Sequence, residues 1–224
     1  ATQFRALGIP ADAIWLDIDY MDRFRVFTVD RRRFPDLARL SRDLAADGIH
    51  SVAILDPGIA VHEGDEMCAS GIEGGHFVLD AKGRPARGRV WPGTCHFPDF
   101  TRGETRAWWA KRASAFVHAN GLVGLWTDMN EPSVFKTPAR TLPDSARHGG
   151  LGGGTHARFH NLYGRLMAEA TRDGLTAARP DRRPFVLTRS NHLGGSRFAA
   201  TWTGDNQATW DDLMHEIYVR QAIE

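Results

Sequence analysis

Five short apolar runs alternate with longer segments of helical periodicity, and this alternation constrains the fold more than any other feature. It is typical of strand–helix–strand units, in which the strands form a parallel sheet. We therefore predict an α/β protein. The predicted strands are residues 13–16, 51–55, 122–126, 185–187 and 199–202.

Three helices are predicted between these strands, and turn or capping residues mark their ends. They span residues 34–47, which Pro35 opens in the first turn, 101–120, which a Thr101-x-x-Glu104 capping box opens, and 155–173, which Gly174 closes. Residues 3–8 read as the tail of a helix, and 210–224 form a further helical pattern.

Two long segments interrupt the pattern, at residues 57–100 and 132–155. The first holds too much glycine and polar sequence for a core helix, and it suggests a hairpin that pairs residues 77–79 with 89–91. The second, rich in glycine, predicts a long flexible loop. Both leave the carboxyl end of a strand, which is the face where (β/α)8 barrels build their active sites.

Composition excludes several classes of protein. The chain has 28 Lys and Arg against 27 Asp and Glu, so charge gives no case for nucleic acid or an anionic membrane as a partner. No run approaches the roughly 18 to 20 apolar residues of a membrane span, and the first residues lack the layout of a signal peptide. We expect a soluble, cytoplasmic protein without cofactor or metal, in which Cys68 and Cys95 are weakly buried or free thiols.

Each predicted strand ends close to a charged residue. These residues are Asp17, Asp56, Asp128, Arg189 and Asp205. Aspartate is common after strands because it caps helices and starts turns. That explanation fits Asp128 and Asp205 less well, since each follows a Trp-Thr pair in a segment unlike a helix entry. We expect the five side chains to converge on one pocket.

Several blocks of this sequence resemble glycoside hydrolase family 31, the α-glucosidase and α-xylosidase family. Trp126 to Phe135, WTDMNEPSVF, is similar to the nucleophile signature of that family. In the same order, further blocks are IWLDIDYMD from Ile14, ILDP from Ile54, VWPGTCHFPDF from Val90, RPFVLTRS from Arg183 and TWTGDN from Thr201. The resemblance implies a (β/α)8 barrel, here incomplete, with about five βα units that correspond roughly to strands 2 to 6.

The resemblance also implies roles for individual residues. Asp128 matches the nucleophile and Asp205 the general acid/base. Asp17 and Arg189 match residues that hydrogen-bond the sugar in subsite −1, and Asp56 and Met129 join the substrate-binding set. Trp91, Trp126 and Trp202 match the aromatic wall.

The implied function is a retaining α-glycoside hydrolase that releases terminal α-linked glucose from oligosaccharides through a covalent glycosyl-enzyme. Such chemistry needs two carboxyl groups about 5.5 Å apart, one ionised and one protonated. Two alternatives remain, namely α-xylosidase or another specificity of the family, and a non-catalytic carbohydrate-binding protein. Because the family pattern continues beyond Asp205, we expect these 224 residues alone to be inactive, and a homo-oligomer through other domains stays open.

Other residues have simpler interpretations. Asp17, Asp19 and Asp22 superficially resemble a cation site but provide too few clustered oxygens. Glu131 competes with Asp128 as nucleophile, and we interpret it as a brace for its loop. His156 and His160 lie one helical turn apart without an acidic partner, so we predict a surface feature.

Overall fold

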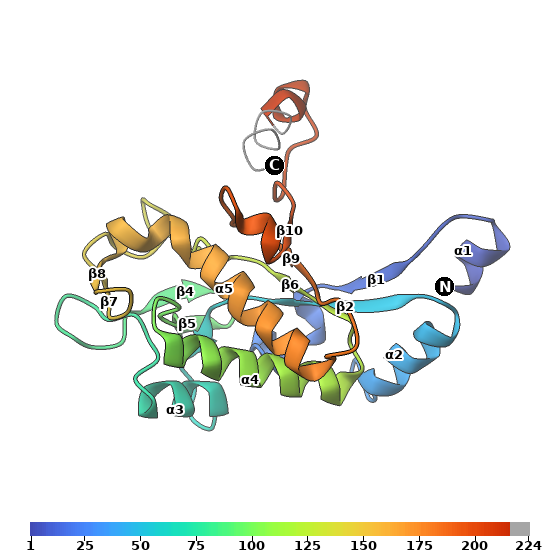
Figure 1. Cartoon of the computed structure of the whole chain (residues 1–224), viewed down its shortest axis with the longest axis horizontal. Helices are drawn as coiled ribbons and strands as arrows, with labels where there is room; N and C mark the ends of the chain where they lie inside the picture. The colour runs from blue at the N-terminus through green and yellow to red at the C-terminus, as the bar shows by residue number, and fades with distance from the viewer. Residues whose placement is uncertain (216–224) are drawn as a thin grey trace.

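The computed structural model describes residues 1–215 and centres on a five-stranded parallel sheet (Figure 1). Neighbours in the sheet follow the chain, in the order β1-β2-β6-β9-β10, as expected for consecutive right-handed βα units. The strands are β1 (Ala13–Leu16), β2 (His50–Leu55), β6 (Gly124–Thr127), β9 (Phe185–Thr188) and β10 (Ala200–Thr201). The predicted parallel sheet is therefore confirmed.

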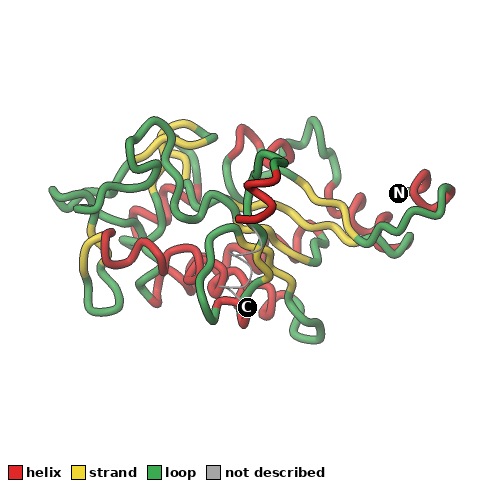
Figure 2. Tube along the Cα trace, turned by 90° about the horizontal axis from the view of Figure 1, so that it is seen from above, coloured by secondary structure: helices red, strands yellow, loops and turns green. Residues whose placement is uncertain are grey.

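Three helices cover one face of the sheet (Figures 1 and 2). They are α2 (Leu37–Ala46), α4 (Gly103–Asn120) and α5 (His156–Ala178). The Asp36 side chain caps α2 by accepting from the Arg39 N–H. Pro35 therefore lies before the helix and not in its first turn, where it was predicted. The predicted capping box of α4 is wrong, since Thr101 donates its hydroxyl to Asp99 and Arg102 occupies the N-cap position.

Helix α5 continues four residues past Gly174, the predicted stop. A Cβ atom on Gly174 would lie 2.5 Å from the Ala110 carbonyl oxygen and 2.9 Å from the Ala113 Cβ, both in α4. Glycine is thus required by the close approach of the two helices rather than by a turn. Glycine often ends a helix, but at this position it allows α5 to pack closely against α4.

The face of the sheet opposite these helices is aromatic. The Trp15 ring lies 6.2 Å from that of Trp126 and 5.9 Å from that of Phe185. Parallel register brings Trp15 and Phe185 into one row across Val52 and Gly124. A Cβ on Gly124 would stand 2.8 Å from the Phe185 ring, so the glycine makes room for this contact.

The first long segment forms a small subdomain. It contains β3 (Ile59–Ala60), α3 (Glu66–Glu73), β4 (Gly88–Val90) and β5 (Gly93–His96), with the strands in the antiparallel order β3-β5-β4. The predicted hairpin is wrong, because β4 pairs with β5 while Leu79 bridges Pro85 and Arg147. The helix α3 was not predicted, although Asp65 caps it and it buries Met67 and Cys68. Both cysteines are free, as predicted, but they are buried rather than weakly buried.

The second long segment contains a pair of two-residue strands, β7 (Arg147–His148) and β8 (Gly154–Thr155). Its residues Leu142 and Ala146 are buried in the core, so the segment is anchored to the domain and differs from the long flexible loop that its glycines predicted. Both segments gather at the end of the sheet opposite the N-terminus (Figure 1).

The remaining elements are short. They are α1 (Thr2–Ala6), η1 (Ile18–Tyr20), η2 (Asp22–Phe24) and η3 (Gly195–Arg197), with a further helical turn at residues 210–215. Strands β9 and β10 are joined through η3 alone, so this βα unit lacks an α-helix. The rest of the predicted C-terminal helix lies outside the described residues. None of the described helices combines the length and hydropathy that a membrane span requires.

Candidate active site

The charged residues predicted from the sequence lie at one edge of the sheet. Asp17, Asp56, Asp128 and Arg189 each directly follow a strand, and Asp205 follows β10 by four residues. Since the strands are parallel and in register, with Leu55 beside Thr127 and Thr127 beside Thr188, their carboxyl ends meet at this edge. This edge is our candidate active site.

Asp128 occupies the centre of the edge. It is 9% exposed, and its backbone N–H donates to the Leu55 carbonyl at 3.1 Å, which fixes it beside the end of β2. Arg189 Nη1 lies 3.0 Å from Asp128 Oδ1 as an ion pair, but Oδ1 accepts no aligned hydrogen bond. Burial raises the pKa of Asp128, Arg189 opposes this shift, and the charges of Glu131 and Asp205 add to it.

Arg189 is held by Glu131 in a two-pronged pair. Nε and Nη2 of the guanidinium each lie 2.9 Å from a carboxylate oxygen of Glu131, and Nη2 also donates to Ser133 Oγ at 3.1 Å. Burial raises the pKa of Glu131, but the hydrogen bonds from Arg189 and Ser133 outweigh it and lower the pKa overall. Glu131 therefore braces its loop as expected, and Arg189 retains only Nη1 toward Asp128.

Asp56 is the most deeply buried of the predicted site carboxylates. It is 3% exposed, and its Oδ1 has no hydrogen-bond partner. Burial, reinforced by the charge of Asp128, raises the pKa of Asp56 to about 8. In contrast, Asp17 and Asp205 are exposed. Asp17 accepts from the Ile18 N–H at 2.7 Å, the simple capping role that the sequence left open.

The aromatic residues divide into two groups. Trp126 and Trp202 form an edge-to-face pair with ring centres 5.3 Å apart. Trp91, 46% exposed, instead packs on Phe135 at 4.9 Å and lies near Phe24. Met129 is buried, and its sulfur lies 3.2 Å from Arg189 Nη2. The expected wall of three tryptophans is thus one pair and one separate residue.

The aspartates that resemble a cation site have other partners. Asp19 pairs with Arg33 at 2.8 Å, and Asp22 pairs with Arg25. Among the described residues, no group of three or more His, Cys, Asp and Glu side chains is arranged to hold a metal ion.

A buried polar network behind the edge was not predicted. Asp99 accepts from His148 Nδ1 at 2.9 Å and from the Gly149 N–H at 2.6 Å, and His148 Nε2 lies 3.1 Å from His156 Nδ1. His156 Nε2 in turn lies 3.2 Å from Thr141 Oγ1. The surface role predicted for His156 is wrong, because its side chain is fully buried and burial lowers its pKa to about 3. Nothing in the spacing of these residues indicates the network.

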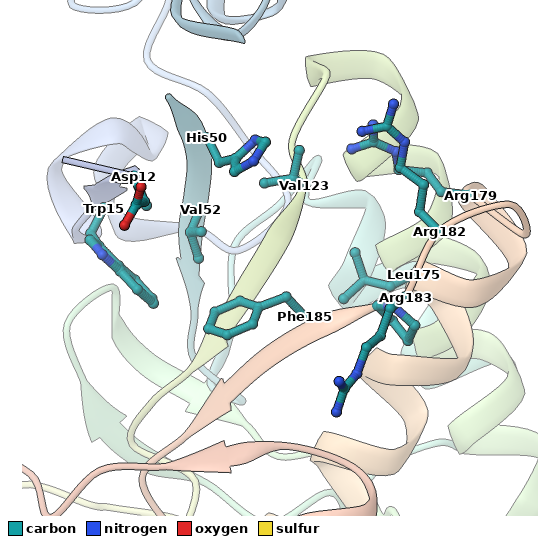
Figure 3. Close-up of a pocket in the computed structure, with 12 residues that line it drawn as sticks. Asp12, Trp15, His50, Val52, Val123, Leu175, Arg179, Arg182, Arg183 and Phe185 are labelled. Atoms are coloured by element: carbon teal, nitrogen blue, oxygen red, sulfur yellow. The ribbon is translucent and has the colours of Figure 1, made fainter. Parts of the chain in front are cut away.

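A separate hollow lies at the opposite, amino end of the strands (Figure 3). Trp15 and Phe185 form its apolar wall, and arginines of the segment after α5 stand at its rim. It contains Asp12 and His50 but none of the carboxylates described above, so its chemistry does not match the candidate site.

Comparisons with known proteins agree with this arrangement. Residues 1–223 match the model of the glycosyl hydrolases family 31 TIM-barrel domain. The chain is 42% identical to alpha-glucosidase 2 of Bacillus thermoamyloliquefaciens over 218 residues, which cover 97% of the chain and 27% of that protein. It is also 42% identical to human neutral alpha-glucosidase AB over 213 residues, 94% of the chain and 22% of that protein. The chain thus spans about a quarter of the length of these relatives.

A solved structure shows the same likeness in three dimensions. The crystal structure of a family 31 alpha-glucosidase from Bacteroides thetaiotaomicron superposes with a TM-score of 0.80 at 44% identity. The superposition covers 95% of this chain and 34% of that one.

Proposed function

The chain belongs to glycosyl hydrolase family 31, and from this premise we propose that it carries the catalytic centre of a retaining α-glucosidase. The substrate is a terminal α-linked glucose of an oligosaccharide, and the reaction proceeds through a covalent glycosyl-enzyme. The names of the relatives support the glucose specificity. The observation that carries the proposal is the buried Asp128 beside Arg189 at the carboxyl edge of the sheet.

Asp128 is the nucleophile in this mechanism. It attacks the anomeric carbon of the sugar, and an arginine cation at 3.0 Å favours the ionised carboxylate that attack requires. Its backbone hydrogen bond to Leu55 fixes the position of Asp128 relative to β2. The carboxylate is therefore oriented before the attack, which lowers the entropic cost of the reaction.

Asp205 is the general acid and base. It lies on the exposed side of the edge, yet its charge acts on both Asp128 and Arg189. In the first step its carboxyl group gives a proton to the departing glycosidic oxygen, and in the second step the resulting carboxylate takes a proton from the attacking water. The edge-to-face pair of Trp126 and Trp202 offers apolar surface for the sugar ring beside it.

The experiment that tests this function is covalent trapping in the full-length protein. A 2-deoxy-2-fluoro or 5-fluoro α-glucosyl fluoride should inactivate the enzyme, and mass spectrometry should locate the label on Asp128. The Asp128→Ala variant should lose turnover and labelling together. A label on Glu131, or hydrolysis that yields the β-anomer first, contradicts the assigned mechanism. A protein that binds maltose without turnover or labelling would favour the non-catalytic alternative.

A further inference from the structure

Asp56 is a buried carboxyl group without a partner for its charge. It is 3% exposed, and Oδ1 makes no hydrogen bond. The effective penalty for burying an ionised carboxylate is several kcal/mol unless a cation or hydrogen-bond donors compensate it. A group in this position is therefore expected to retain its proton.

The charges around Asp56 favour this protonated form. The negative charges of Asp128, Asp17 and Glu131 raise the pKa of Asp56, whereas the positive charge of Arg189 lowers it. The charge of Asp56 in turn raises the pKa of Tyr20 in η1 and of Cys95 in β5. Tyr20 does not donate to Asp56, because the Tyr20 hydroxyl donates to the Ile54 carbonyl at 2.8 Å.

Arg189 does not neutralise Asp56 either. Its Nε and Nη2 atoms bond to Glu131, and its Nη1 lies against Asp128. Two neighbouring carboxyl groups that interact strongly share their protons, and the group farther from a cation keeps its proton to higher pH. Asp128 has the guanidinium at 3.0 Å, so the proton resides on Asp56.

We propose that Asp56 is a neutral carboxylic acid whose O–H donates to Asp128, and that it positions the nucleophile through this hydrogen bond. The proposal rests on the function proposed above. It accounts for Asp56 Oδ1, which is buried and makes no hydrogen bond, and for Asp128 Oδ1, which has the Arg189 ion pair but accepts no aligned hydrogen bond. A donor beside Asp128 also stabilises its ionised form, which counteracts the burial that raises the pKa of Asp128.

The proposal predicts a specific pH dependence. Burial and the charge of Asp128 raise the pKa of Asp56 to about 8. Below that pH the donor is present. Above it Asp56 becomes a second anion that repels Asp128, so kcat/KM should fall about tenfold per pH unit, as for a single ionisation. A residue that merely fills space would not produce this limb.

The first experiment compares pH profiles of the full-length wild type and Asp56→Asn. The substrate is α-glucosyl fluoride, whose leaving group needs little protonation, so that Asp205 does not dominate the alkaline limb. The asparagine amide still donates but cannot ionise. The alkaline fall centred near pH 8 should disappear in Asp56→Asn, whatever the height of its profile. An unchanged alkaline limb would overturn the proposal.

The second experiment needs no activity. The infrared C=O band of protonated carboxyl groups at pH 7 should lose one component in Asp56→Asn relative to the wild type, whereas the exposed-site control Asp181→Asn should leave the band unchanged. Removing the charge of Asp128 in Asp128→Asn should shift the titration of this component to lower pH. If Asp56→Asn fails to fold, the shift of the infrared titration in Asp128→Asn tests the proposal by itself.

The outcomes separate the two proposals. A wild type without this component, or a component whose titration ignores Asp128→Asn, overturns the role of Asp56. If Asp128→Asn retains turnover, the assigned nucleophile is wrong, while the infrared titration still reports the proton on Asp56.

Discussion

Gly164 is predicted to control activity without contacting substrate. It lies in α5, and a Cβ placed on it would stand 2.5 Å from the Ser190 Cβ and 2.6 Å from the Ser190 carbonyl oxygen. Ser190 follows Arg189 directly, and its N–H donates to the buried Asn130 side chain at 3.0 Å. A substitution at Gly164 therefore pushes on the backbone that carries Arg189.

The size of the effect follows from these distances. Non-bonded carbon atoms are comfortable at about 3.5 to 4.0 Å, so Gly164→Ala must displace Ser190 by about 1 Å. An error of about 1 Å in a catalytic group can cost on the order of 10²-fold in rate. Alanine gains up to about 1 kcal/mol in helix propensity, but overpacking costs about 1 to 3 kcal/mol, so we expect net destabilisation of about 1 kcal/mol.

The assay measures kcat/KM and thermal unfolding of the full-length protein. Gly103→Ala is the matched control, because this first residue of α4 has no atom within 4 Å of the added Cβ. We expect Gly164→Ala to lose about 10²-fold in kcat/KM, and Gly103→Ala to keep wild-type kinetics and a stability within about 0.5 kcal/mol. Wild-type kcat/KM in Gly164→Ala would refute the coupling between α5 and Arg189.

Four further predictions follow from the site and from the network behind it. Asp205→Ala should lose roughly 10² to 10⁴-fold on maltose but far less on an activated aryl α-glucoside, and equal losses measured on both substrates would remove it as the acid. Glu131→Gln should lower kcat more than it raises KM, because the neutral amide binds Arg189 more weakly and leaves its guanidinium less well positioned. A change in KM alone would argue against a role of Glu131 in positioning Arg189. Asp99→Ala should speed amide exchange at residues 141–156, since it leaves the His148 and Gly149 donors unpaired, and unchanged exchange by mass spectrometry would show that other contacts suffice. The free energy of unfolding should fall as pH decreases from about 6.5 toward about 3, because His156 binds a proton in the unfolded chain but stays neutral in the folded state. Chemical denaturation at pH 7 and at pH 5 should show a smaller fall in this free energy for His156→Gln than for the wild type.

The positions of the strands and of the candidate active site were predictable because they depend on local sequence. Apolar runs that stop at a charged residue define both the strand and its end, and parallel pairing then brings Asp128 and Arg189 together. The family resemblance assigned their roles. No long-range information was needed for this part.

The remaining features depend on neighbours that are distant in the sequence. Thr101 has the spacing of a cap, but its hydroxyl oxygen accepts from the Gly150 N–H, 49 residues away. Gly174 has the look of a helix stop, but α4 lies against it. The burial of His156 and the raised pKa of Asp56 depend on side chains that other strands and loops contribute, so no periodicity in the sequence indicates them.

The hydrogen bonds from His148 and Gly149 to Asp99 join the segments 57–100 and 132–155. We therefore expect the two segments to change together during evolution. A chimera that exchanges only one of them with a relative risks the loss of the His148 and Gly149 donors to the buried Asp99, at a cost of about 1 to 3 kcal/mol for each group left unpaired. A chimera that exchanges both preserves the junction. Because loops at this face set the chemistry that a barrel performs, new specificities in this lineage are expected to arise by paired loop replacement.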